Sequence, residues 1–295
     1  MRVTDLAMIE PRPGRTVTGM QVGQPSRTAM ATAQSRAYHQ LADEPRIFTD
    51  PLAVRIVGEE AARDNPFDKG VDPELARRRR LFLATRSRFA DDTVAEAVAG
   101  GTRQVVVLGA GMDTAAYRNP HPDVRFFEVD HPDTQAWKRN RLSEAGIEVP
   151  HSMTFAPVDF HRDDLADALA QAGLDRARSA VYVWLGVVVY LEHDAIAETL
   201  RYIAGQGGGA DLVFDYSYPP DAGQQARGKR VAAVGEPWVS FFTEEQMRSE
   251  LESAGFTDIE DHSGIALVRS YADLPADGPA LPGPHLVRAR TAVND

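Results

Sequence analysis

The sequence predicts an α/β fold of the Rossmann-like type, in which a mostly parallel sheet carries helices on both faces. Short apolar segments typical of strands alternate with helical segments through the middle of the chain. The first of these apolar segments runs directly into a glycine-containing turn, as the first strand of such a sheet often does. Because strands that alternate with helices of this length form βαβ units, the sheet should be largely parallel with right-handed crossovers.

Size and composition favour one large domain. The chain has 295 residues, of which 43% are hydrophobic and 25% are charged, and these are ordinary values for a globular protein with a sizeable core. Residues 1–25 are rich in Pro, Gly, Arg and Thr without an apolar period, which predicts a flexible tail. We therefore expect a single domain over residues 26–295, with a helical cap and lead-in over 26–100 and the core over 101–295.

Three helices are expected before the sheet and form the predicted N-terminal cap. An alanine-rich run over 26–41 follows a serine start, and the segment 48–51 breaks the chain before a short helix over 52–57. Helix formers fill residues 72–99, and this helix should end at the glycine pair 100–101, where glycine can adopt the left-handed cap.

Seven strands are expected after this cap. The parallel strands are predicted at residues 104–108, 124–129, 152–157, 180–185 and 210–215, with helices between them at 133–145, 163–172 and 194–204. A further helix over 243–254 begins with Thr243 and has Gln246 three residues later, which is a capping-box pattern. Strands over 255–262 and 286–291 would close the sheet, and the Pro/Gly-rich segment 272–284 between them should be a surface loop.

Charge and residue content exclude several classes of function. The formal net charge of −11 opposes binding to phosphate backbones, so we expect a small-molecule substrate and no nucleic acid. The basic run over 77–80 is interpreted as a solvated helix face or a partner-binding edge. The absence of cysteine excludes disulfides and thiolate chemistry, and we expect no metal site. No segment approaches the roughly 20 apolar residues of a membrane span or has a signal's apolar region, so a cytoplasmic protein is expected.

The strongest local signal is the turn Gly109-Ala110-Gly111, which follows an apolar strand and precedes a helix that Met112-Asp113-Thr114 would open. Glycines let the backbone pass close to a ligand, and a helix N-terminus offers free amide donors. The turn favours an adenosine-like ligand, although a tight strand-to-helix turn without a ligand would show the same pattern. Dinucleotide sites expect a third glycine where Thr114 stands, which argues against NAD.

Two acids follow the next two strands. Asp130 ends the second strand about 20 residues after the glycines, where a carboxylate can accept hydrogen bonds from both ribose hydroxyls. It is better placed at the strand end than Glu128, and its structural alternative is to cap the helix that starts at Asp133. Asp159 and Phe160 follow the third strand, and an acid and an aromatic together could bond an adenine amino group and cover its ring.

These residues belong to a set of motifs that resembles the leucine carboxyl methyltransferase family. The resemblance begins with VLGAGMDT at 107–114, which is followed by Tyr117-Arg118. Further matches to the family and its bacterial branch are TDPLA at 49–53, RSRFADD at 86–92, FEVDHP at 127–132 and GVVVYL at 186–191. The resemblance spans about residues 26 to 290 and implies the class I methyltransferase fold with S-adenosyl-L-methionine as the cofactor.

The resemblance also implies roles for individual residues. Arg86 would pair with the methionine carboxylate of the cofactor, and the Gly109-Ala110-Gly111 turn would form the floor beneath it. Asp130 would hold the ribose, and Asp159 with Phe160 the adenine. From its position on a long helix alone, Arg86 could equally be solvated or paired with a nearby acid such as Asp91.

One position departs from the family pattern. The family usually has a glutamate before the Gly-Val of its fourth-strand motif, whereas this chain has Leu185 before Gly186. A leucine cannot accept a hydrogen bond or pair with the ammonium group of the cofactor. We therefore include Leu185 among the cofactor-binding positions. With leucine there, either the cofactor binds more weakly or is held differently, or the site serves another reaction.

The acceptor decides which catalytic groups are needed. Methyl transfer from a sulfonium is an in-line displacement, so much of the catalysis can come from positioning. A carboxylate acceptor is already ionised at pH 7 and needs no general base, so no catalytic residue is named. A phenol or alcohol would need a base such as His39, His131 or His193, although each of these is also interpreted as a surface or capping residue.

Substrate contacts are expected from the 26–41 helix and from an insert near 216–242, which the family packs over the open end of the sheet. These segments carry aromatic and basic residues that suit an apolar, polycyclic acid. Arg36 and Arg230 are expected to steer the acceptor carboxylate, because a guanidinium binds carboxylates with bidentate geometry. The predicted substrate-binding residues are Arg36, Tyr38, Tyr190, Tyr216, Arg230 and Trp238.

The sequence therefore predicts an S-adenosyl-L-methionine-dependent O-methyltransferase that acts on the carboxyl group of a small secondary metabolite rather than on a protein C-terminus. The alternative is a methyltransferase-like protein that binds the cofactor but serves as a cyclase or a non-methylating binding module in a biosynthetic pathway, and Leu185 motivates it. An NAD-dependent reductase is a third interpretation, against which the missing glycine argues. The sequence leaves the oligomeric state open.

Overall fold

The structure is a computed structural model that describes residues 26–65, 68–160, 162–219, 228–229, 232, 235–273 and 283–292. The predictions made for the tail over 1–25, for Arg230 and for most of the loop over 272–284 lie outside the described residues.

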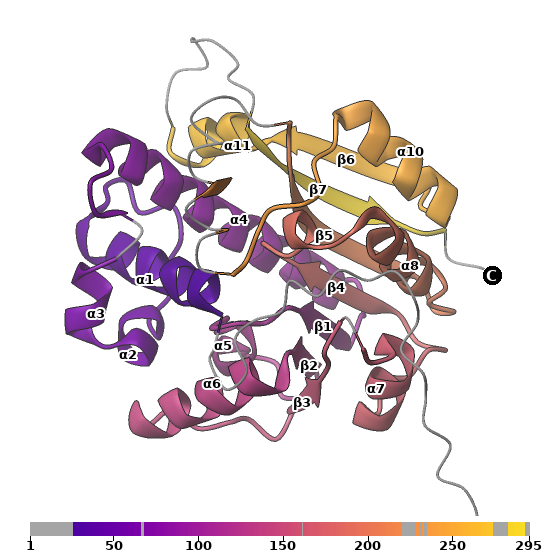
Figure 1. Ribbon diagram of the computed structural model, residues 1–295. Coiled ribbons are helices and arrows are strands. Elements are labelled where there is room, and N and C mark those ends of the chain that lie inside the picture. The colour runs from indigo at the N-terminus through magenta and orange to yellow at the C-terminus, as the bar shows by residue number, and fades with distance from the viewer. Residues whose placement is uncertain are drawn as a thin grey trace, which may run out of the picture.

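A seven-stranded sheet forms the centre of the molecule, in the order β3-β2-β1-β4-β5-β7-β6 (Figure 1). Strands β1 to β5 pair in parallel, and β7 pairs antiparallel with both β5 and β6. The predicted α/β class and the mostly parallel sheet are confirmed. The strands are β1 Gln104–Leu108, β2 Arg125–Asp130, β3 Met153–Pro157, β4 Ala180–Trp184, β5 Ala210–Ser217, β6 Asp258–Ser263 and β7 Pro284–Arg290.

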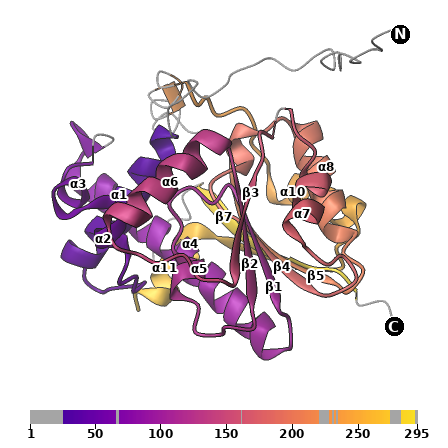
Figure 2. The same cartoon turned by 90° about the horizontal axis from the view of Figure 1, so that it is seen from below.

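Helices cover both faces of the sheet because the strands are apolar on both faces, as parallel strands usually are. Figure 2 shows α7 (Leu165–Ala172), α8 (His193–Ala204) and α10 (Glu244–Ala254) on one side of the strands and α4 (Pro73–Ala99) on the other. In β1, Val106 and Leu108 pack on the side of α7, α8 and α10, whereas Val105 and Val107 pack on the side of α4. Both cores are therefore built from alternate residues of the same strands.

The N-terminal helices α1 to α3 lie together beside the sheet and form a cap (Figure 1). Ser26 caps α1 by accepting the N–H of Ala29 at 3.0 Å, which satisfies one of the free donors of the helix start. Apolar residues of these helices pack against α6 and against Met112 of the loop after β1. The cap helices are α1 Arg27–Ala42, α2 Ala53–Val57 and α3 Glu59–Arg63, and α6 is Pro132–Glu144.

Three short elements were not predicted. Helix α3 and the 3-10 turn η2 (Val188–Tyr190) are too short for apolar periodicity to show them. Helix α11 (Gly264–Tyr271) follows β6 directly and packs against α4, and no side chain caps its first turn. No element was predicted for these residues, which lie between the predicted strand over 255–262 and the predicted loop over 272–284.

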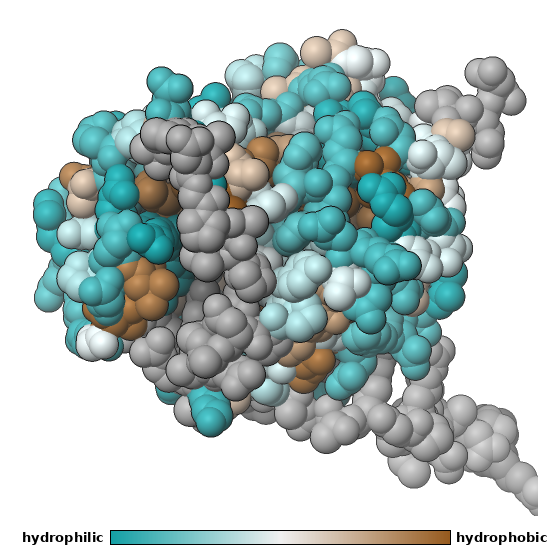
Figure 3. All heavy atoms as spheres, turned by 90° about the horizontal axis from the view of Figure 1, so that it is seen from above, coloured by the Kyte–Doolittle hydropathy of each residue, from teal (hydrophilic) through white to brown (hydrophobic). Residues whose placement is uncertain are grey.

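On the face that Figure 3 shows, the described surface is mostly hydrophilic and the apolar residues emerge as separate groups. Within the part of the chain that the structure describes, no helix combines the length and the apolar character needed to cross a membrane.

Candidate functional site

A large cavity opens at the carboxyl ends of the parallel strands. Because β1 lies between β2 and β4, the connections leave it in opposite directions, and such a switch point leaves a crevice outside the strand ends. The loops that follow β1 to β4 line this cavity together with the end of β5 and with parts of α1 and α4, and its volume is about 1370 Å³. Single-ligand sites measure about 300 to 1,000 Å³, so there is room for two ligands side by side.

The glycine turn after β1 forms part of the cavity wall. Gly109 has φ +66°, and a Cβ there would lie 2.3 Å from Cγ2 of Val187. Gly111 has φ +47° and lies close to Ala29 of the cap. The turn therefore needs glycine for its backbone conformation and for close packing. Helix α5 (Ala115–Arg118) begins three residues later than expected and has four residues, so Met112-Asp113-Thr114 belongs to the loop and not to the helix.

Asp130 lies at the end of β2 beside this turn. Its carboxylate accepts the backbone N–H of Gly111 at 2.5 Å and that of His131 at 2.7 Å. Burial raises the pKa of the Asp130 carboxyl, and the two N–H donors oppose this effect. Helix α6 is capped by His131, whose ring nitrogen accepts the N–H of Asp133. The capping alternative for Asp130 is therefore wrong, and its carboxylate lines the cavity.

Asp159 and Phe160 lie beyond Asp130 on the same wall, after β3. The Asp159 carboxylate is 3.9 Å from Nε2 of His131 and 3.6 Å from Nε of Arg162. Phe160 is partly buried and packs against the core layer of α7 and α8. The predicted ribose and adenine residues thus occupy one continuous stretch of the cavity.

Arg86 and Leu185 lie on the other side of the glycine turn. Nη1 of Arg86 donates to Oδ2 of Asp215 at 3.0 Å, so its protein partner is Asp215 and not Asp91, which was the structural alternative. Asp91 instead binds Arg118, at 2.7 Å. All eight predicted cofactor-binding positions line the cavity, namely Arg86, Gly109, Ala110, Gly111, Asp130, Asp159, Phe160 and Leu185.

Asp215 also lines the cavity, and the sequence reasoning missed it. The signal was present, because Asp215 ends the fifth predicted strand as Asp130 ends the second. The register pairs Trp184 with Phe214, so the residues that follow these two, Leu185 and Asp215, lie side by side.

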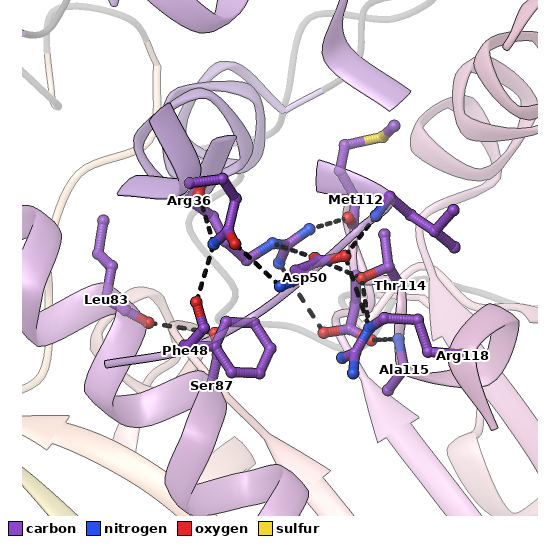
Figure 4. A network of polar contacts seen from close by, with 12 residues as sticks. Arg36, Phe48, Asp50, Leu83, Ser87, Met112, Thr114, Ala115 and Arg118 are labelled. Atoms are coloured by element: carbon purple, nitrogen blue, oxygen red, sulfur yellow. Dashed lines mark hydrogen bonds and ion pairs between the residues drawn. The ribbon is translucent and has the colours of Figure 1, made fainter. Parts of the chain in front are cut away.

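Arg36 reaches the cavity wall from α1 but is already bound on the protein side (Figure 4). Its Nε lies 3.1 Å from Oδ2 of Asp50, and Nη2 donates to the carbonyl of Met112. Asp50 also accepts the hydroxyl of Thr114 at 2.6 Å. Arg36 therefore ties the cap to the loop after β1, and its predicted role in steering an acceptor stays a prediction.

The other predicted substrate residues divide into two groups. Tyr190 and Trp238 line the cavity. Tyr38 is not among the lining residues, and its ring lies 4.7 Å from the guanidinium of Arg80. Tyr216 is buried away from the cavity, where its hydroxyl donates to Asp261 at 2.7 Å. The structure therefore brings only part of this predicted set together.

Residues of α4 and of the loop 235–241 line the side of the cavity next to α1, where the acceptor was predicted to bind (the acceptor side). Glu236 accepts the N–H groups of Arg27 at 2.9 Å and of Thr28 at 3.3 Å, so this loop is bound to the start of α1. Phe82 and Leu83, which the sequence reasoning did not assign to the site, line the same side, and so does Phe241 of the predicted substrate-side insert.

The three histidines considered as bases lie in different places. His39 is buried 3.2 Å from Asp43, and His193 stacks on Phe242 with 4.6 Å between ring centroids. Only His131 lines the cavity among the histidines that the structure describes, and it lies between Asp130 and Asp159. No group of three or more potential metal-binding side chains occurs among the described residues.

Comparison with known proteins places the chain among methyltransferases. Residues 29–204 match the family described as leucine carboxyl methyltransferase. A protein of Bacillus subtilis, named as an S-adenosyl-L-methionine-dependent methyltransferase, is 29% identical over 80% of this chain and 88% of its own length. A protein of Mycolicibacterium gilvum with the same description is 31% identical over 80% of this chain and 79% of its own.

Solved structures show the same fold at low sequence identity. A protein of Thermobifida fusca, described as a methyltransferase, has a TM-score of 0.57 at 16% identity and covers 97% of this chain and 100% of its own. A protein of Streptomyces avermitilis, assigned to the DUF574 family, has a TM-score of 0.54 at 16% identity and covers 88% of this chain and 97% of its own.

Proposed function

Because the chain belongs to the leucine carboxyl methyltransferase family and is an S-adenosyl-L-methionine-dependent methyltransferase, we propose that it methylates a carboxyl group of a small metabolite. The observation that carries the proposal is a two-ligand cavity whose acceptor side combines a group of apolar side chains with polar ones and has no histidine among its described lining residues.

The cavity residues fit the cofactor. Gly109 and Gly111 carry no side chain where they line the cavity, so a ligand can lie against the backbone of the turn. Asp130 uses one position on each carboxylate oxygen for a backbone N–H, and each oxygen keeps a second lone pair for a ribose hydroxyl. Arg86 supplies a cation for the amino-acid end. These roles are proposals that rest on the position and chemistry of each residue.

The acceptor side favours a small, largely apolar molecule. Phe82, Leu83 and Trp238 offer an apolar surface, and Glu236 holds the loop 235–241 against α1 beside it. An apolar surface beside a loop that is held in place favours a small molecule over a polar peptide. A small acid is therefore the better fit.

A carboxylate acceptor also suits the ionisable groups nearby. The bound cofactor supplies an electrophilic methyl group on a sulfonium. An ionised carboxylate attacks without losing a proton, so the protein has only to align the acceptor and exclude water. His131 lies near Asp159, on the adenine side of the proposed site, and is poorly placed to act as a base.

The proposal can be tested by incubating the protein with S-adenosyl-L-methionine and matched small acids and phenols. We expect methylated products from carboxylic acids, detected by mass spectrometry and removed by mild alkali, because alkali hydrolyses esters and not ethers. Alkali-stable products formed only from phenols would contradict the carboxyl assignment, and methylation of peptides with a free C-terminus alone would contradict the small-molecule assignment.

The other interpretations have less support. The relatives carry methyltransferase names, and nothing in the comparisons favours a cyclase or a non-methylating binding module. A role in secondary metabolism, a cytoplasmic location and the absence of nucleic-acid and membrane partners remain predictions from the sequence.

A further inference from the structure

Arg86 and Asp215 form a partly shielded ion pair on the cavity wall. Their side chains are 11% and 10% exposed, and Nη1 of Arg86 lies 3.0 Å from Oδ2 of Asp215. The backbone N–H of Gly186 donates to Oδ1 of Asp215 at 2.5 Å. A carboxylate has about four acceptor positions, and these two bonds leave positions on Asp215 for a further donor.

The backbone beside this pair leaves room for the guanidinium of Arg86 to lie against it at the cavity wall. Gly186 has φ +70°, and a Cβ there would lie 2.8 Å from Nη1 of Arg86. The neighbouring Leu185 also lines the cavity but carries no acceptor atom. Asp215 is therefore the carboxylate that this part of the wall offers beside Arg86.

A cation and an anion held side by side match an α-amino acid, whose carboxylate and ammonium groups are also adjacent. We propose that Asp215 binds the α-ammonium group of the S-adenosyl-L-methionine cofactor while Arg86 binds its α-carboxylate. When the ligand enters, each protein charge gains a partner of opposite sign, so neither is left buried and unpaired. The inference rests on the cofactor and is independent of the proposed acceptor.

Asp215 in this role explains how the site tolerates Leu185. The β4–β5 register places the two residues on neighbouring strand ends, so a carboxylate on either strand end can face the same ligand group. In this proposal, the carboxylate for the ammonium group comes from β5, and none is needed at the end of β4, where Leu185 stands.

The test is a thermodynamic cycle that removes either the ligand's amino group or the charge of Asp215. Calorimetry would compare S-adenosylhomocysteine with its analogue lacking only the amino group, for the wild type and for Asp215→Asn. Asparagine keeps an oxygen for the N–H of Gly186. We expect the variant to bind S-adenosylhomocysteine about 10- to 100-fold more weakly and the deaminated analogue nearly as well as the wild type does, because a charge-assisted hydrogen bond is lost only in the first case.

Two further variants serve as a control and as a rescue of the lost carboxylate. Asp211→Asn is the matched control, since Asp211 lies on the same strand and pairs with Arg288 at 2.7 Å with similar burial. We expect it to leave both affinities unchanged. In the double variant Asp215→Asn/Leu185→Glu, a carboxylate returns to the neighbouring strand end, and the affinity for S-adenosylhomocysteine should recover at least in part.

Equal losses for both ligands in Asp215→Asn would mean that Asp215 only positions Arg86, and they would overturn the proposal. No loss for either ligand would overturn it as well, while leaving the carboxyl-methylation proposal intact. A wild type that binds neither ligand would refute the cofactor on which both proposals depend.

Discussion

Nε of Arg36 in the cap lies 3.1 Å from Oδ2 of Asp50, and the same Asp50 oxygen accepts the hydroxyl of Thr114 in the loop after β1. The two charged side chains are 7% and 0% exposed. One buried carboxylate therefore joins the acceptor-side cap to the loop that carries the glycine turn (Figure 4).

Removing Arg36 should destabilise the fold more than it weakens acceptor binding. Arg36→Met would leave Asp50 buried with Arg118, 3.6 Å away, as its remaining cation. Breaking a buried ion pair on one side costs about 3–5 kcal/mol, so chemical denaturation should show a loss of this order. Arg78→Met is the control, because its pair with Glu74 is exposed and such pairs contribute about 0.3–0.5 kcal/mol.

The same variant separates the two roles considered for Arg36. If Arg36 steered the acceptor carboxylate, Arg36→Met would raise the KM of the acceptor and leave the free energy of unfolding unchanged. A stable variant with a raised KM would therefore support the steering role and contradict the structural one.

The sheet could be predicted from the sequence because each parallel strand is a short apolar segment between helical segments, which is a local pattern. Residues 104–108 form a strand with the predicted ends, and Asp130 lies at a strand end beside the glycine turn, as expected. Position at the ends of parallel strands was enough to predict that the glycine turn, Asp130 and Asp159 line one cavity, since all carboxyl ends meet at one edge of the sheet.

The acceptor side could not be predicted in the same way. Tyr216 was predicted to line the cavity, but the alternation of side chains along β5 directs it into the core, where its ring stacks on His285. Arg36 has the chemistry of a carboxylate-binding residue, yet a long-range contact with Asp50 uses its guanidinium. Such partners are set by how distant segments pack, which single-sequence patterns do not show.

Alanine at Gly109 should be far more damaging than alanine at another glycine of the same backbone conformation. Gly109→Ala would bring its Cβ to 2.3 Å from Cγ2 of Val187, whereas Gly146 has φ +62° and open space around a Cβ. Left-handed alanine costs about 1–2 kcal/mol, which is the loss expected for Gly146→Ala by chemical denaturation. Gly109→Ala should lose about 1–3 kcal/mol more, as overpacked sites do.

A double variant tests whether this extra loss comes from the close approach. Val187→Ala removes the clashing methyl group, so Gly109→Ala/Val187→Ala should lose less stability than the sum of the two single losses. Additive losses would show that the contact with Val187 is not what requires glycine at position 109.

Glu128 and Lys138 form a buried ion pair behind the cofactor wall, with 2.7 Å between Nζ and Oε2. Burial raises the pKa of the Glu128 carboxyl to about 7 from an ordinary value of 4.5, although the ammonium group of Lys138 opposes this effect. The unfolded state therefore releases this proton at lower pH than the folded state does. The contribution of Glu128 to stability is full below pH 4.5 and is lost as the pH rises towards 7.

Replacing Lys138 should extend this loss to higher pH. Lys138→Met removes the cation that lowers the pKa of Glu128, so the folded state would hold the proton beyond pH 7. Between pH 7 and pH 8.5, the free energy of unfolding of Lys138→Met in urea should then fall by about 1–2 kcal/mol more than that of the wild type. The double variant Glu128→Gln/Lys138→Met has no ionisable group at this position and should lack the extra loss. If the single and double variants lose stability in parallel, Glu128 does not titrate in this range and the assigned direction of its pKa is wrong.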